Sequence, residues 1–115
     1  MVDKLHTPQE VAGLIAKIIL ALRTEGSRSE GLIEAKARAM SVYDKALGVR
    51  SLEHHDGGMK VTMIKDQAKA DAHQLLMEKI VAEESLKAHY TRLDTLKAQL
   101  NGWQSVNRYL ETITR

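Results

Sequence analysis

The sequence contains no cysteine, no phenylalanine and a single proline among its 115 residues. Without cysteine, a disulfide framework, a thiolate metal site and a cysteine nucleophile are all excluded. One proline and seven glycines supply too few turn residues for the many short strands of a β-sandwich or barrel. Aromatic residues make up only 3%, so a core must consist mostly of Ala, Leu, Ile, Val and Met, which suit helices. We therefore expect an all-α fold in a single helical domain over residues 1–115.

Long hydrophobic runs are also missing. The longest apolar stretch, residues 11–22, includes Lys17 and is shorter than the roughly 20 residues that cross a bilayer. At the N-terminus Asp3 offsets Lys4, and no small-residue cleavage site of a secretory leader follows. These features predict a cytoplasmic protein that has no membrane partner.

Neither sign of charge dominates. There are 17 basic and 15 acidic residues, giving a net charge of +2, which is too small a bias to indicate nucleic-acid binding by itself. The basic excess lies in the C-terminal part of the chain, from Leu86 onward.

The first helix is predicted from its start signal. Thr7 suits the N-cap, Pro8 the first helical position, and Glu10 the third position of a capping box. Apolar residues then recur at steps of three and four as far as residue 22, and Gly26 supplies a stop. We expect a helix over 8–25.

A second helix is predicted over 29–47, with Ser27 or Ser29 as its cap and Gly48 as its end. The next segment, 48–59, is polar and lacks periodicity, and it contains Gly57-Gly58. We expect a loop there.

The remaining chain, 60–113, contains no proline and only Gly102, so it predicts one very long helix of about 80 Å. A coiled-coil-like seam follows a seven-residue repeat within it, and His89 and Asn107 take its polar inward positions. The seam residues are Leu86, Leu93, Leu96, Leu100, Trp103 and Leu110. The pattern changes register at 81–85, where we expect a bend or a change of packing partner; a break into two helices there is the alternative.

These lengths predict an N-terminal helix plus a helical hairpin that self-associates. Each of the first two helices spans at most about 28 Å, so folded back they leave part of the seam uncovered unless they lie end to end. An exposed stripe of Leu and Trp is best covered by a second copy or an obligate partner. We expect a homo-oligomer; a compact three-helix bundle with a split last helix is the alternative.

No enzyme signature is present. The chain lacks phosphate-binding glycine loops, serine elbows and the Glu-x-x-His and His-Glu-x-x-His patterns of helical metal sites. His54, His55 and Asp56 offer nitrogen and oxygen ligands, but closed zinc sites need four well-spaced ligands, so we interpret them as loop polarity. We predict no catalytic activity, no cofactor, no metal and no small-molecule substrate; a metal-dependent enzyme that uses this loop is the third and weakest alternative.

A polar stripe beside the seam indicates nucleic-acid contact. Its residues, all hydrogen-bond donors, are Lys97, Asn101, Gln104, Arg108 and Arg115. Such donors on one helical line suit a phosphate backbone, and Trp103 and Tyr109 nearby could stack on bases unless they are buried. A solvated coiled-coil flank of the same composition is the alternative.

Two segments, AKARAMSVYDKALG (35–48) and TMIKDQAKADAHQLLMEKIVAEESLKAHYTRLDTLKAQLNGWQSVNRYLE (62–111), carry a family resemblance. They resemble small helical-hairpin proteins encoded in early gene clusters of bacteriophages and prophages, among genes for single-stranded DNA binding and recombination. The shared features are an Ala-spaced helix with a Tyr near its end, a short polar loop and a long Ala/Lys/Asp-rich helix. Residues 1–31 lie outside the resemblance.

The resemblance implies a non-enzymatic bacteriophage-type accessory protein for DNA recombination or replication. Such a protein would act by oligomerisation and by contact with single-stranded DNA or with a phage or host DNA-binding protein. A structural or interaction coiled-coil protein, such as an assembly scaffold or an inhibitor of a host protein, is the alternative that requires no nucleic acid.

Overall fold

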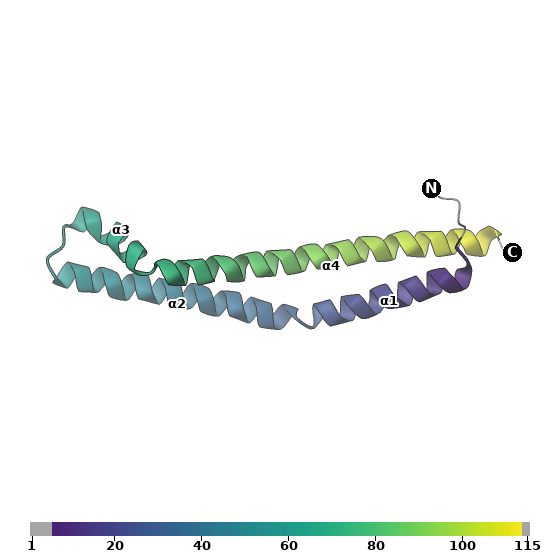
Figure 1. Ribbon diagram of the computed structural model, residues 1–115, viewed down its shortest axis with the longest axis horizontal. Helices are drawn as coiled ribbons and strands as arrows, with labels where there is room; N and C mark the ends of the chain where they lie inside the picture. The colour runs from purple at the N-terminus through teal and green to yellow at the C-terminus, as the bar shows by residue number, and fades with distance from the viewer. Residues whose placement is uncertain (1–5, 114–115) are drawn as a thin grey trace. The chain divides into compact units, whose positions relative to one another are not determined.

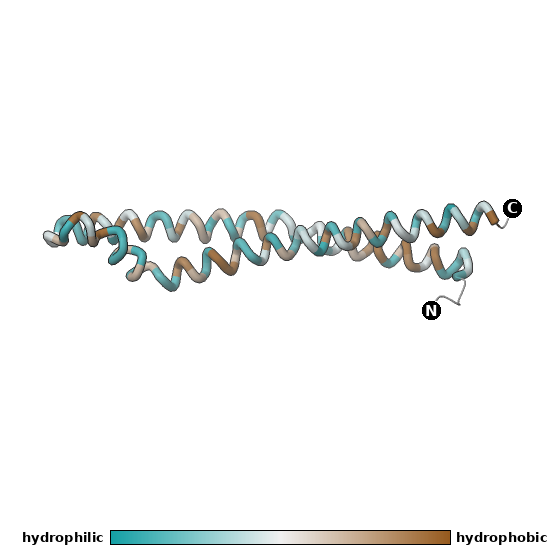
Figure 2. Tube along the Cα trace, turned by 90° about the horizontal axis from the view of Figure 1, so that it is seen from above, coloured by the Kyte–Doolittle hydropathy of each residue, from teal (hydrophilic) through white to brown (hydrophobic). Residues whose placement is uncertain are grey.

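The computed structural model describes residues 6–113 and shows only α-helices in that range. In chain order these are α1 (Pro8–Gly26), α2 (Ser29–Asp56), α3 (Val61–Asp71) and α4 (His73–Ile113) (Figure 1). Hydrophobic and hydrophilic residues alternate along the helices rather than forming separate blocks (Figure 2). The all-α prediction is confirmed, including the N-terminal helix and the long C-terminal helix.

No helix within residues 6–113 combines the length and the apolarity that a membrane crossing requires.

The chain divides into two compact units, where the sequence predicted one domain over 1–115. We call Met1–Ser29 with His89–Arg115 the terminal unit, described here within residues 6–113, and Glu30–Ala88 the central unit. Helix α4 belongs to both, because its residues 73–88 lie in the central unit and its residues 89–113 in the terminal unit.

In the terminal unit, α1 begins and ends where its sequence signals predict. The Thr7 hydroxyl accepts a hydrogen bond from the Glu10 backbone N–H at 3.1 Å, and Pro8 occupies the first turn. The helix ends at Gly26. Val11 and Ile18 are buried on the side of α1 that packs along residues 89–113 of α4.

The predicted caps of the second helix are wrong, because both serines make other bonds. Ser27 Oγ donates to the Thr24 carbonyl oxygen at 2.7 Å, at the end of α1. Ser29 is the first residue of α2, but its hydroxyl lies 2.7 Å from His89 Nε2 on α4. The capping box predicted at the start of α1 is only half formed. Thr7 accepts from the Glu10 N–H, but the Glu10 carboxylate lies 3.3 Å from His6 Nδ1 instead of bonding back to Thr7.

The predicted loop over 48–59 is wrong as far as Asp56, because α2 continues through Gly48. A glycine inside a helix costs only about 1 kcal/mol, which neighbouring interactions outweigh. Arg50 donates to Glu53 at 3.1 Å within the extended part of α2.

The turn between α2 and α3 is confined to residues 57–60. The backbone N–H groups of Gly57 and Gly58 donate to the carbonyl oxygens of Glu53 and His55, which closes the last turn of α2. Gly58 has φ 84°, a conformation that residues with a side chain rarely adopt. The glycine pair is therefore the real stop signal, nine residues later than the predicted one.

The predicted continuous helix over 60–113, with a bend at 81–85, is also wrong. The interruption lies at Ala72 (φ −96°, ψ 16°), and α4 runs unbroken through 81–85. Only one residue leaves the helical conformation, and Ala72 still donates to the Ala68 carbonyl oxygen and accepts from the Leu76 N–H. Ala68 and Ala72 are both buried, so packing in the central unit fixes this break where local sequence gives no signal.

The central unit has a small core. Tyr43 on α2 is buried, and the ammonium of Lys79 on α4 lies 5.2 Å from the centre of its ring. Ala68, Ala72 and Leu86 are the other hydrophobic residues buried within Glu30–Ala88.

Candidate functional site

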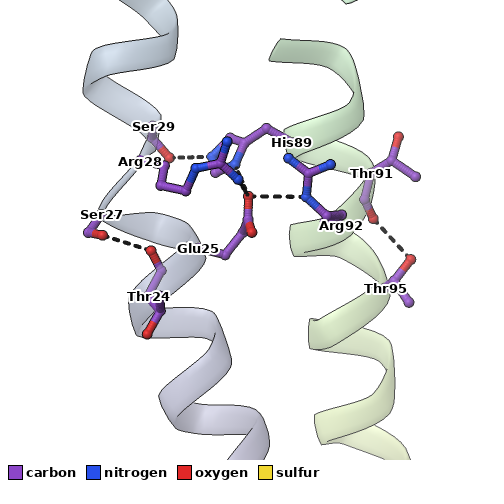
Figure 3. A network of polar contacts seen from close by, with 9 residues as sticks. All are labelled: Thr24, Glu25, Ser27, Arg28, Ser29, His89, Thr91, Arg92 and Thr95. Atoms are coloured by element: carbon purple, nitrogen blue, oxygen red, sulfur yellow. Dashed lines mark hydrogen bonds and ion pairs between the residues drawn. The ribbon is translucent and has the colours of Figure 1, made fainter. Parts of the chain in front are cut away.

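A polar network around the buried His89 joins α1, α2 and α4 inside the terminal unit (Figure 3). His89 of α4 is fully buried, as its inward position in the predicted seam requires. Its Nδ1 donates to Glu25 Oε2 at 2.6 Å, and its Nε2 lies 2.7 Å from Ser29 Oγ. Both ring nitrogens of the histidine are thus satisfied by residues at the junction of α1 and α2.

Glu25 is the electrostatic centre of this network. Its Oε2 also accepts from Arg92 Nε at 3.2 Å and from Arg28 Nη1 at 3.1 Å. The hydrogen bond from His89 is the largest influence that lowers the pKa of Glu25, ahead of the hydrogen bond and charge of Arg92 and the charge of Arg28. Partial burial opposes this shift but does not reverse it. Glu25 is therefore held as a carboxylate that ties α1 to α4.

The order of groups, hydroxyl to imidazole to carboxylate, is that of a nucleophilic triad. The surroundings favour a structural role, because two arginines compete with the imidazole for the same carboxylate oxygen. The groove beside the network is lined by Glu25 and by Thr91, Arg92, Thr95 and Leu96 of α4, on the side of the carboxylate. We interpret the network as a polar contact that sets the register of α1 against α4.

The polar stripe predicted on the long helix lies on α4. Lys97, Asn101, Gln104 and Arg108 are all exposed, and Arg108 donates to Ser105 Oγ at 3.3 Å. Arg115 lies outside the described residues. The four described members share one exposed line of the terminal unit.

The two aromatic residues near the stripe differ in exposure. Trp103 is partly covered, and its ring meets the ring of His6 edge-on, with the centroids 5.1 Å apart. Tyr109 is 63% exposed. Of these two, Tyr109 is the more exposed and so the more accessible to a stacking base.

The six seam residues are buried or partly buried within the single chain. Leu86 and Leu110 are buried, and Leu93, Leu96, Leu100 and Trp103 are partly buried. In the terminal unit α1 packs along this side of α4 and covers part of it. Self-association through the seam stays a prediction.

The three polar residues of the predicted loop do not converge. His54 Nε2 donates to Asp71 Oδ2 at 2.6 Å, which ties the end of α2 to the end of α3. His55 and Asp56 are exposed. Among residues 6–113 no three His, Cys, Asp or Glu side chains are grouped closely enough to hold a metal ion.

The His54 contact lowers the pKa of Asp71, with a smaller contribution in the same direction from a hydrogen bond donated by Gln67.

Sequence reasoning missed a different feature, the exposed apolar surface of the central unit. The large hydrophobic residues exposed there are Ile33, Val42, Val49, Leu52, Val61, Met63, Met77, Ile80 and Val81. Part of the signal was present, because the spacing of Ala35, Ala39, Val42 and Ala46 predicts a ridge that admits a close helix neighbour.

No protein-family model, curated protein or solved structure matches this chain.

Proposed function

We propose that this chain is a non-enzymatic accessory protein for DNA recombination or replication that contacts single-stranded DNA through the polar stripe of α4. The supporting observation is that Lys97, Asn101, Gln104 and Arg108 are all exposed on one line of a continuous helix. The bacteriophage setting rests on the resemblance of residues 35–48 and 62–111.

The chemistry of the stripe suits an extended polyanion. Lys97 and Arg108 are separated by about 16 Å along the helix axis, so each cation would meet a different phosphate. The amides of Asn101 and Gln104 between them donate to phosphate oxygens or base edges. Tyr109 offers an exposed ring on which a base would stack.

The test is fluorescence anisotropy of a labelled single-stranded oligonucleotide at about 50 and about 200 mM salt, because phosphate contacts weaken steeply over that range. We expect salt-sensitive binding that Lys97→Glu combined with Arg108→Glu abolishes. The matched control is Lys65→Glu with Lys69→Glu on α3, which makes the same change in net charge at exposed positions of the other unit. Binding that survives the α4 changes, or equal loss in both variants, would reject the stripe.

A second candidate is an interaction protein, a scaffold or an inhibitor, without nucleic-acid contact. The exposed apolar residues that share one side of α2, Val42, Val49 and Leu52, favour it, because grouped apolar side chains on a surface mark contact sites more often than scattered ones do. Absence of oligonucleotide binding at the lower salt concentration would leave this candidate.

A further inference from the structure

One side of α2 is apolar and exposed within the central unit. Val42 is 45% exposed, Val49 47% and Leu52 61%. We call this side the α2 face. By helical spacing it comprises Val42, Lys45, Ala46, Val49, Leu52, Glu53 and Asp56. Val42, Val49 and Asp56 are seven residues apart, the spacing that keeps positions on one side of a helix in a coiled coil.

The α2 face borders a groove of about 310 Å³. Its apolar walls come from Val42, Ala46 and Val49 of α2 and from Leu75 of α4, and Lys45, Arg50 and Glu53 form its polar rim. An apolar floor with charges along the rim is the arrangement expected where another helix packs.

The charges of the α2 face are complementary to those of a second α2 helix that runs antiparallel to it. In an antiparallel pair of α2 helices centred on Val49, Lys45 lies opposite Glu53 of the second copy, and Ala46 lies opposite Leu52. The carboxylate of Glu53 also accepts from Arg50 of its own chain at 3.1 Å, which leaves its second oxygen for Lys45. A two-fold axis makes each of these pairings occur twice. Val42 lies opposite Asp56, the last residue of α2, whose side chain is 70% exposed in the single chain.

A parallel pair would instead place Lys45 against Lys45 and Glu53 against Glu53. Like charges at flanking positions of a helix pair select against that orientation. The charge pattern therefore discriminates between the two arrangements and also favours a second copy over an unrelated partner.

We propose that the α2 face is a homodimer interface in which two copies of α2 pack antiparallel about Val49. This interface does not involve the α4 stripe, which lies in the other unit, so the presence or absence of DNA binding does not test it.

The first test is the mass in solution by sedimentation equilibrium. We expect about 26 kDa, twice the 12.9 kDa of the chain. Lys45→Glu alone and Glu53→Lys alone should each yield monomers, since each creates two like-charge pairs across the axis. An equimolar mixture of these two variants should recover the dimer, because each chain then meets opposite charges on the other.

The control is Asp44→Lys, an exposed position on another side of α2, which should leave the dimer intact. Circular dichroism of every variant reports whether the helices form, so loss of the dimer is separated from loss of the fold. A mass of 12.9 kDa at every concentration, or a dimer that both charge reversals leave unchanged, would overturn the proposal.

The second test uses the absence of cysteine. Val49→Cys should form a disulfide-linked dimer with oxidised glutathione, because residue 49 meets its own copy at the axis. Lys45→Cys should cross-link to Glu53→Cys in a mixture but not to itself, and Asp44→Cys should stay monomeric. Cross-linking of Lys45→Cys to itself would indicate a parallel pair and overturn the proposed orientation.

Discussion

The terminal unit and the central unit are both built from paired helices, yet they differ in how they cover their apolar side chains. In the terminal unit, α1 packs along α4 and buries Val11, Ile18 and Leu110 together with the bonded His89. In the central unit, nine large hydrophobic residues stay exposed, against five in the described part of the terminal unit. The described part of the terminal unit thus packs around a buried histidine, whereas the central unit has more of its large hydrophobic residues exposed to solvent.

The largest expected effect comes from breaking the buried contact of the terminal unit. His89→Ala removes a fully buried side chain and leaves Glu25 and Ser29 without their shared partner. We expect the free energy of unfolding to fall by about 2–4 kcal/mol, measured by urea titration, because both a cavity and unmade hydrogen bonds result. His55→Ala, an exposed histidine of the central unit, should change it by no more than a few tenths of a kcal/mol. Equal effects of the two variants would contradict the comparison.

The second largest effect is expected from low pH, which should lower the stability of the terminal unit. The folded state lowers the pKa of Glu25 below its ordinary value of 4.5, chiefly through the hydrogen bond from His89. A carboxyl group with a depressed folded pKa contributes stability above its unfolded pKa, and this stability is lost as the pH falls through the folded pKa. The urea midpoint should therefore drop below about pH 4.5, and Glu25→Gln should reduce that drop. An identical pH profile for the wild-type protein and Glu25→Gln would show that Glu25 has no part in it.

A pair of glycine substitutions should act with opposite signs in the two units. Gly58→Ala in the central unit should destabilise the protein by about 1–2 kcal/mol, because φ 84° crowds a Cβ atom. Gly13→Ala in the middle of α1, where no atom lies within 4 Å of the new methyl group, should stabilise it by about 0.5–1 kcal/mol. Thermal midpoints by circular dichroism measure both, and a stabilised Gly58→Ala would show that the turn is not held in this conformation.

The smallest effect is expected at the tie between α2 and α3. His54 and Asp71 are each about one quarter exposed, and ion pairs that reach solvent contribute little. His54→Ala should lower the thermal midpoint by less than Gly58→Ala does, and amide hydrogen exchange should quicken in α3 while residues 8–26 keep their rates. Faster exchange in α1 would mean that this contact also supports the terminal unit.

The elements that the sequence predicted well are those set by neighbours along the chain. The start of α1 depends on Thr7 and Pro8, and both act within one turn. The inward position of His89 follows from the spacing of the leucines around it, and its complete burial agrees with that prediction.

The misplaced boundaries have two different causes. Gly48 was interpreted as a stop because glycine disfavours helices, but its cost is small enough for the contacts of α2 to outweigh. The break at Ala72 has no local signal, since alanine is the best helix former. The features beside the break are long-range ones: Ala68 and Ala72 are buried, and Asp71 bonds to His54, 17 residues earlier.

The residues that bond to His89 could not be predicted from the sequence either, because they are also far away along the chain. Ser29 and Glu25 meet His89 across 60 and 64 residues of sequence, so no spacing rule connects them. The polar stripe, in contrast, lies within a single helix, and its periodicity placed the four described residues together on one exposed line.

The edge-on contact of Trp103 with His6 has a spectroscopic consequence. Trp103 is the single tryptophan of the chain, and it lies in the terminal unit, so indole fluorescence is an optical label for that unit alone. Far-ultraviolet circular dichroism, in contrast, sums over the helices of both units. Recorded together in one urea titration, the two signals separate the units without any added dye: a fluorescence transition at higher urea than the dichroism transition would be the direct signature of a terminal unit that outlasts the central one.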